Sequence, residues 1–197
     1  MGRKISDSEK HLLIKFDCWH IEYYRFIKES FPDVPSIFVY RLPMEVVESH
    51  LRMKGMQMIP GMVKSKLLEI NEPVLTAEDL QMYLVNVLKR IFQTGVNEII
   101  KNETLLLNYN SLPSISWTIL LDYFNISHST DDIEIIKHRS KFDAKNTNLE
   151  FNSKKPPNWS PVPEQLKIAV SEKLDPLYKK LEEIRMEQEN QLKFFSV

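Results

Sequence analysis

Arg41 and Ser49 are the residues of this chain whose types and spacing point most directly to chemistry. They lie in the segment 36–49, which predicts an apolar strand over 37–40, a turn at Pro43 and the start of a helix. Proline suits the first turn of a helix, because its missing N–H has no partner there. Arg41 then follows the carboxyl end of a strand, where open α/β sheets bind ligands. A guanidinium with five donors and a hydroxyl eight residues later can hold a phosphate. The alternative is a plain strand–turn–helix with an arginine at its turn.

The segment resembles the 3′-phosphate-binding segment of the sulfotransferases, which use 3′-phosphoadenosine 5′-phosphosulfate (PAPS) as the sulfuryl donor. In that family a hydrophobic strand precedes an Arg, then Asn or Asp, then Pro, with a Ser eight positions after the Arg. Arg41, Pro43 and Ser49 match this pattern in type and spacing, whereas Leu42 replaces the usual polar residue. The resemblance implies that Arg41 and Ser49 bind the 3′-phosphate of PAPS.

Further segments resemble the same family in the same order along nearly the whole chain. They cover 12–17, 31–35, 104–112, 142–146 and 174–178, and the last two are similar to the tail of bacterial sulfotransferase-like proteins. The resemblance also implies that Lys145 approaches the nucleotide.

One large part of the family pattern is absent. Sulfotransferases begin with a strand, a Gly- and Ser-rich phosphate loop and a helix, and that loop holds the 5′-phosphosulfate with backbone N–H groups and a Lys. The four glycines of this sequence form no such cradle, and no Gly-Lys-Ser or Gly-Lys-Thr occurs. The chain therefore resembles the C-terminal part of a sulfotransferase domain, with a candidate site for the 3′ end of the donor and none for the 5′ end.

Lys15, Asp17 and His20 are the candidate catalytic residues. By resemblance, a base near this place takes the proton of the acceptor hydroxyl. An imidazole has a suitable pKa for this task, whereas a carboxylate needs burial to raise its pKa. Lys15 could neutralise donor oxygens. Alternatively, Asp17 caps a helix, His20 packs beside Trp19, and Lys15 closes a strand with a charge.

The elements that must position these residues alternate between strands and helices. We expect strands at 12–17, 36–40 and 104–108, and helices at about 19–31, 43–54, 77–101, 113–124 and 130–139, followed by a long surface loop at 140–162 and a terminal helix at 163–190. The pattern predicts an α/β fold in which a three-layer parallel sheet has helices on its faces. By resemblance, this is a truncated sulfotransferase-like P-loop NTPase fold with a helical C-terminal half. We expect one domain over 1–197. A partner chain or another segment could supply the missing strand.

The methionines Met53, Met56, Met58 and Met62 surround Pro60-Gly61. Flexible thioethers suit an adaptable apolar wall for an acceptor. They equally suit a loop folded on the core.

Composition narrows the classes of function. The 197 residues are 43% hydrophobic and 27% charged, with a net charge of −1, which argues against binding nucleic acid by bulk charge. The five histidines lack the i, i+4 spacing of a helical metal site, so we expect no metal. No apolar run approaches the ~20 residues of a membrane span, so we expect no membrane partner. A single cysteine and a start without an apolar signal core predict a cytoplasmic protein.

Two functions remain open at this point. In the first, the protein binds PAPS and, if complete, transfers its sulfuryl group to a hydroxyl or amine acceptor that the sequence does not identify. In the second, it is a non-catalytic sulfotransferase-like module for binding or interaction. A nucleotide kinase relative is disfavoured because no Gly-Lys-Ser or Gly-Lys-Thr is present.

Overall fold

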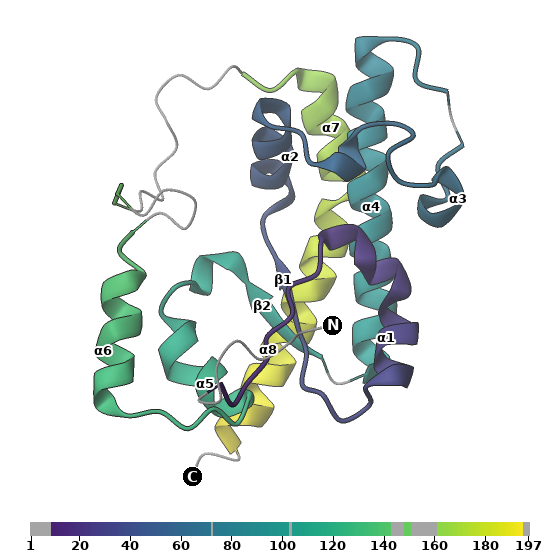
Figure 1. Cartoon of the computed structure of the whole chain (residues 1–197). Helices are drawn as coiled ribbons and strands as arrows, with labels where there is room; N and C mark the ends of the chain where they lie inside the picture. Colours follow the sequence, from purple (N-terminus) through teal and green to yellow (C-terminus); the bar gives the residue numbers. More distant parts are fainter. Residues whose placement is uncertain (1–8, 72, 103, 143–147, 151–160, 195–197) are drawn as a thin grey trace. The chain divides into compact units, whose positions relative to one another are not determined.

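The computed structural model describes residues 9–71, 73–102, 104–142, 148–150 and 161–194. The chain divides into two compact units. Unit 1 comprises Met1–His20 and Leu112–Ser153, and unit 2 comprises Ile21–Ser111 and Lys154–Val197. Unit 2 holds both strands and most of the helices (Figure 1).

The sheet of unit 2 has two parallel strands, β1 (Ile37–Tyr40) and β2 (Leu105–Asn108). Their register pairs Ile37 with Leu105 and Tyr40 with Asn108. Parallel strands need a long crossover, and here it contains α2 (Pro43–Arg52), η2 (Met56–Met58), α3 (Ser65–Leu68) and α4 (Ala77–Asn102). Before β1, the chain forms η1 (Cys18–Tyr23) and α1 (Tyr24–Ser30), and α1 packs on α4.

The prediction of a three-layer fold around a larger parallel sheet is wrong, because the sheet has only two strands in the described part of the chain. Residues 11–17 form no strand, and the large apolar side chains of this segment are 48–67% exposed. An apolar run becomes a strand only when its backbone pairs with a neighbour, and the described residues include no ladder partner for this segment. The predicted strands at 36–40 and 104–108 are present and parallel, but two strands do not make the expected fold.

Helix α4 begins as its sequence predicts. The hydroxyl of Thr76 accepts a hydrogen bond from the N–H of Asp79 at 3.1 Å, and the Asp79 carboxylate accepts from the N–H groups of Thr76 and Leu75 at 2.9 and 3.0 Å. These bonds satisfy donors that the helix itself leaves open, and they lower the pKa of Asp79.

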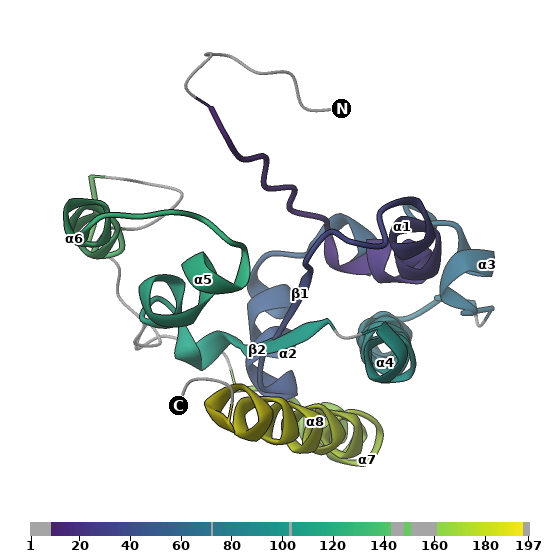
Figure 2. The ribbon, with the colours of Figure 1, turned by 90° about the horizontal axis from the view of Figure 1, so that it is seen from below.

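The region expected to be one terminal helix contains two, α7 (Glu164–Lys173) and α8 (Asp175–Phe194). Pro176 lies in the first turn of α8, where a proline is tolerated, whereas inside one continuous helix it would lack an N–H to donate and its ring would meet the preceding turn. The chain therefore breaks at Leu174, whose side chain is fully buried. Both helices pack against α4, and α8 also covers one face of the sheet (Figures 1 and 2).

Alternate residues of the strands build the core against α4 and α8. Phe38 and Tyr40 from β1 and Leu106 from β2 belong to one cluster with residues of the two helices: Phe92, Val96, Ile99, Leu177, Tyr178, Leu181 and Ile184. Gly95 permits this approach, because a Cβ at that position would lie 2.9 Å from Cζ of Phe38.

Unit 1 contains a π-helical turn, η4 (Ser116–Leu120), then α5 (Leu121–Tyr123) and α6 (Thr130–Arg139). The helix expected at 113–124 is present as one uninterrupted helical stretch over 116–123 whose first part is π-helical, and α6 matches its predicted bounds and starts with a capping box between Ser129 and Asp132. Within the predicted surface loop, Phe142 and Glu150 form an antiparallel bridge. None of the helices in the described ranges is both long enough and apolar enough to cross a lipid bilayer.

Candidate functional site

The carboxyl ends of β1 and β2 lie next to each other, because the register pairs Tyr40 with Asn108. The residues that follow the two strands, Arg41 and Tyr109, are therefore also neighbours. The guanidinium carbon of Arg41 lies 4.8 Å from the centroid of the Tyr109 ring, which is the geometry of a cation–π contact. Nε of Arg41 donates to Oε2 of Glu45, in the first turn of α2, at 2.6 Å.

Arg41 is therefore oriented from two sides. Its side chain is 32% exposed and that of Glu45 is 22% exposed, so the ion pair is partly shielded from water. Within the part of the chain that the structure describes, the hydrogen bond of this guanidinium uses Nε and leaves the terminal nitrogens available. Glu45 binds one edge of the guanidinium and the Tyr109 ring lies against its face. The opposite edge, which carries the terminal nitrogens, therefore points in a fixed direction.

Ser49 lies in α2, one turn beyond Glu45, and is partly exposed. Its backbone carbonyl accepts a hydrogen bond from the N–H of Met53 at 3.0 Å. Among the contacts of the described residues, Arg41 pairs with Glu45 rather than with Ser49. The two predicted clamp residues are thus in the same strand–turn–helix segment, as expected, but a carboxylate of the chain already occupies one side of the arginine.

The predicted catalytic residues belong to unit 1, whereas Arg41 and Ser49 belong to unit 2. Lys15 and Asp17 are exposed. The ring of His20 stacks on that of Trp19 with centroids 3.8 Å apart, and its Nδ1 lies 3.2 Å from the carbonyl oxygen of Asp17. This packing is the structural alternative that the sequence left open for His20. Lys145 lies outside the described residues.

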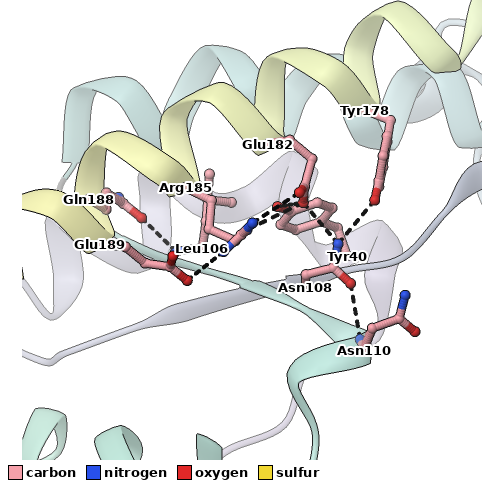
Figure 3. Close-up of polar contacts among 9 residues, drawn as sticks. All are labelled: Tyr40, Leu106, Asn108, Asn110, Tyr178, Glu182, Arg185, Gln188 and Glu189. Carbon is pink, nitrogen blue, oxygen red and sulfur yellow. Dashed lines mark hydrogen bonds and ion pairs between the residues drawn. The ribbon is translucent and has the colours of Figure 1, made fainter.

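A polar cluster behind the strand ends was not predicted (Figure 3). Oε1 of Glu182, in α8, accepts hydrogen bonds from the hydroxyl of Tyr40 and from Nδ2 of Asn108, the latter at 2.8 Å. Oε2 of Glu182 accepts from Nη2 of Arg185 at 3.0 Å. Nδ2 of Asn108 also donates to the hydroxyl of Tyr178 at 3.0 Å. The sequence offered two weak signals for this cluster. Asn108 ends a strand of leucines, and Glu182 and Arg185 are an acid and a base three residues apart in an amphipathic helix.

The cluster holds its groups in fixed protonation states. Burial, followed by the Glu182 contact, raises the pKa of Tyr40 well above its ordinary value. Burial favours the protonated form of Glu182, but the bonds from Arg185, Tyr40 and Asn108 outweigh it and lower the pKa. The Glu182 hydrogen bond raises the pKa of Arg185. An ionised glutamate, a neutral tyrosine and a charged arginine satisfy one another, so the cluster serves to attach α8 to the sheet.

Gln188 extends this attachment along the outer edge of β2. Its Oε1 accepts from the N–H of Leu106 at 2.9 Å, and its Nε2 donates to the carbonyl of Thr104 at 2.8 Å (Figure 3 draws the first of these bonds). The side-chain amide thus replaces a neighbouring strand and closes that edge to further pairing.

The ranges described contain no group of three or more His, Cys, Asp or Glu residues that could hold a metal ion. No family model, curated protein or solved structure matches this chain. The resemblance to sulfotransferases stays a prediction from the sequence.

We expect Gln188→Leu to destabilise the fold by about 1–3 kcal/mol, because it leaves a backbone donor and a backbone acceptor of β2 without partners. Glu187→Ala, an exposed change on the same turn of α8, should alter the free energy of unfolding by less than about 0.5 kcal/mol. Urea denaturation of both variants measures the difference. Equal stabilities would show that Gln188 does not seal the strand edge.

Stability should also depend on pH through Glu182. Its pKa is lowered in the folded state, so its contribution is present above its ordinary value of 4.5 and is lost as the pH falls through the folded pKa. The difference in unfolding free energy between the wild type and Glu182→Gln should therefore shrink between about pH 7 and about pH 3. The exposed Glu183→Gln serves as the matched control. A difference that does not change with pH would contradict the ionised state of Glu182.

Proposed function

We propose that this chain binds a 3′-phosphorylated adenosine nucleotide such as PAPS beside Arg41 and does not itself transfer the sulfuryl group. The observation that carries this proposal is the orientation of the Arg41 guanidinium at the carboxyl ends of two parallel strands. Such strand ends are the usual ligand position of α/β sheets.

Arg41 has the chemistry that a phosphate requires. The ring of Tyr109 and the carboxylate of Glu45 restrict its side chain before any ligand arrives, which reduces the entropy lost on binding. Its terminal nitrogens can then donate two parallel hydrogen bonds to a phosphate. The N-terminus of α2, which starts two residues later at Pro43, adds a favourable dipole for an anion. Ser49 would supply a hydroxyl from the same helix.

Glu45 acts against the same ligand. A phosphate at Arg41 shares the cation with a carboxylate 2.6 Å from Nε and is repelled by that negative charge. Glu45 therefore orients Arg41 but also weakens the attraction between Arg41 and a phosphate. Removal of its charge in Glu45→Gln tests which effect dominates.

The proposal excludes turnover because the sequence supplies no phosphate loop for the 5′-phosphosulfate. Charge shifts at that end of the donor during transfer, and oriented donors there provide most of the catalysis. A clamp on the 3′-phosphate acts equally on the bound donor and on the transition state, so it supports binding without accelerating the reaction.

A non-catalytic interaction module that binds no nucleotide is the second candidate. It is favoured by one observation: Glu45 and Tyr109 already hold Arg41 through an ion pair and a ring contact within the chain. In that case the three residues only connect α2 to the strand ends, and the nucleotide experiment below separates the two candidates.

Adenosine 3′,5′-bisphosphate should bind, and Arg41→Ala should weaken its affinity by about 10- to 150-fold, corresponding to the ~1.5–3 kcal/mol of a charge-assisted bond. Arg41→Lys should also weaken it, because a point charge cannot form the paired bonds. Arg25→Ala, which removes an exposed arginine paired with Glu29, is the control and should leave binding unchanged. Titration calorimetry with adenosine 5′-monophosphate in parallel tests specificity. No binding, or equal binding of the monophosphate, would favour the interaction module.

We further expect no sulfuryl transfer from radiolabelled PAPS to phenols, sugars or amines, although PAPS itself binds. Loss of even one oriented donor costs ~10²–10³ in rate in other enzymes, and here a whole cradle is absent from the sequence. Turnover that disappears in Asp17→Asn or His20→Gln would show that this chain contains a working 5′ site and would refute the proposal.

A further inference from the structure

The segment from the last residues of α2 through α3 exposes an unusual number of apolar side chains. We name residues 51–68 the methionine loop. Five of its apolar side chains are 37–67% exposed: Leu51, Met53, Met56, Ile59 and Met62. Isolated exposed apolar residues are ordinary, but five within twelve positions are a concentration that points to an interaction site.

Buried residues in the middle of the methionine loop hold it against α4. Gln57 and Met58 are buried, with Met58 completely so, and they anchor the middle of the loop beside α4. The N–H of Ile59 donates to the carbonyl of Met56 at 3.1 Å, and the N–H of Met62 donates to that of Ile59 at 3.1 Å. These two successive turns, each closed by a hydrogen bond between residues three positions apart, expose Met56, Ile59 and Met62, while Gln57 and Met58 remain buried.

Two local features hold the turns. Pro60 and Gly61 occupy the centre of the Ile59–Met62 turn, and Gly61 has φ +84°, which is the value that a type II turn requires and that glycine adopts freely. At the other end, Nδ1 of His50 accepts a hydrogen bond from the N–H of Gly55 at 3.2 Å. Burial lowers the pKa of His50, which keeps Nδ1 available as the acceptor.

The charges of the loop all have one sign. Arg52, Lys54, Lys64 and Lys66 are exposed, and no acidic residue occurs from 51 to 68, although the whole chain has a net charge of −1. The acid that follows, Glu69, is bound to Arg90 at 2.5 Å. Lys54, Lys64 and Lys66 therefore flank the exposed methionines.

We propose that the methionine loop binds an anionic lipid surface. Its methionine and isoleucine side chains enter the boundary between headgroups and acyl chains, and Lys54, Lys64 and Lys66 contact the negative headgroups. Burial of apolar side chains and attraction of Lys and Arg to anionic lipid are the two contributions on which peripheral membrane binding depends. A lipid layer accepts projecting side chains without a preformed cavity, whereas an acidic protein partner needs a matching groove.

The proposal differs from the expectation that the chain has no membrane partner, which rested on the absence of a spanning segment. It is also independent of the proposed nucleotide site. Arg41→Ala should leave lipid binding unchanged, so failure of one proposal can be recognised without reference to the other.

Sedimentation with vesicles tests the proposal. The full chain should bind phosphatidylcholine vesicles that contain about 30% phosphatidylserine and should bind vesicles of phosphatidylcholine alone at least about tenfold more weakly. Binding to the anionic vesicles should fall as salt is raised, because surface attraction is screened.

Two triple variants separate the contributions. Met53→Ser with Met56→Ser and Met62→Ser removes apolar burial, and Lys54→Ser with Lys64→Ser and Lys66→Ser removes charge; each should weaken binding at least about tenfold. The control, Ile135→Ser with Ile168→Ser and Met186→Ser, changes three side chains that are 51–60% exposed elsewhere and should bind like the wild type. Circular dichroism verifies that each variant is folded.

Several results would overturn the proposal. They are no binding to the anionic vesicles, equal binding to both kinds of vesicle, or triple variants of the loop that are folded and bind like the control. Binding to soluble polyglutamate together with no binding to vesicles would assign the loop to an acidic protein partner instead.

Discussion

The carboxylate of Glu182 is the contact on which the arrangement of unit 2 depends. It receives hydrogen bonds from Tyr40 at the end of β1, from Asn108 at the end of β2 and from Arg185 on its own helix. One side chain thus connects both strands to α8 (Figure 3). A partly buried carboxylate without such partners would be costly, so the pairing of the strands and the position of the helix are required together.

The consequences for the candidate site follow from the register of the strands. Because Tyr40 lies opposite Asn108, the residues after them, Arg41 and Tyr109, come within contact distance. Gln188 adds a second constraint by closing the outer edge of β2. The sheet therefore ends at β2 with a side-chain amide where a larger α/β sheet would have another strand.

The segment 36–49 shows why a local motif does not establish a fold. Its strand, turn and helix form as the sequence predicts, and they place Arg41 at a strand end. The same motif can occur in sheets of different size, since nothing within it determines how many strands lie beside it. A function proposed for this chain must therefore rest on the geometry around Arg41 rather than on the overall architecture.

The sequence by itself determined the elements whose signals are local. The structure has capping boxes at Thr76 and Ser129 at the starts of α4 and α6, and each is formed by residues three positions apart, so both starts depend on local sequence. The strand at 37–40 and the start of α2 at Pro43 were readable for the same reason.

Only the tertiary structure decided which of the possible long-range partners each residue took. Residues 12–16 have the composition of a strand but no ladder among the described residues, and Met58 is buried while Met53, Met56 and Met62 are exposed. Likewise, the stacking of Arg41 on Tyr109 and the contacts of Glu182 join residues 68 and 142 positions apart. Such contacts depend on how distant segments pack, and hydrophobic pattern and spacing carry no information about that choice.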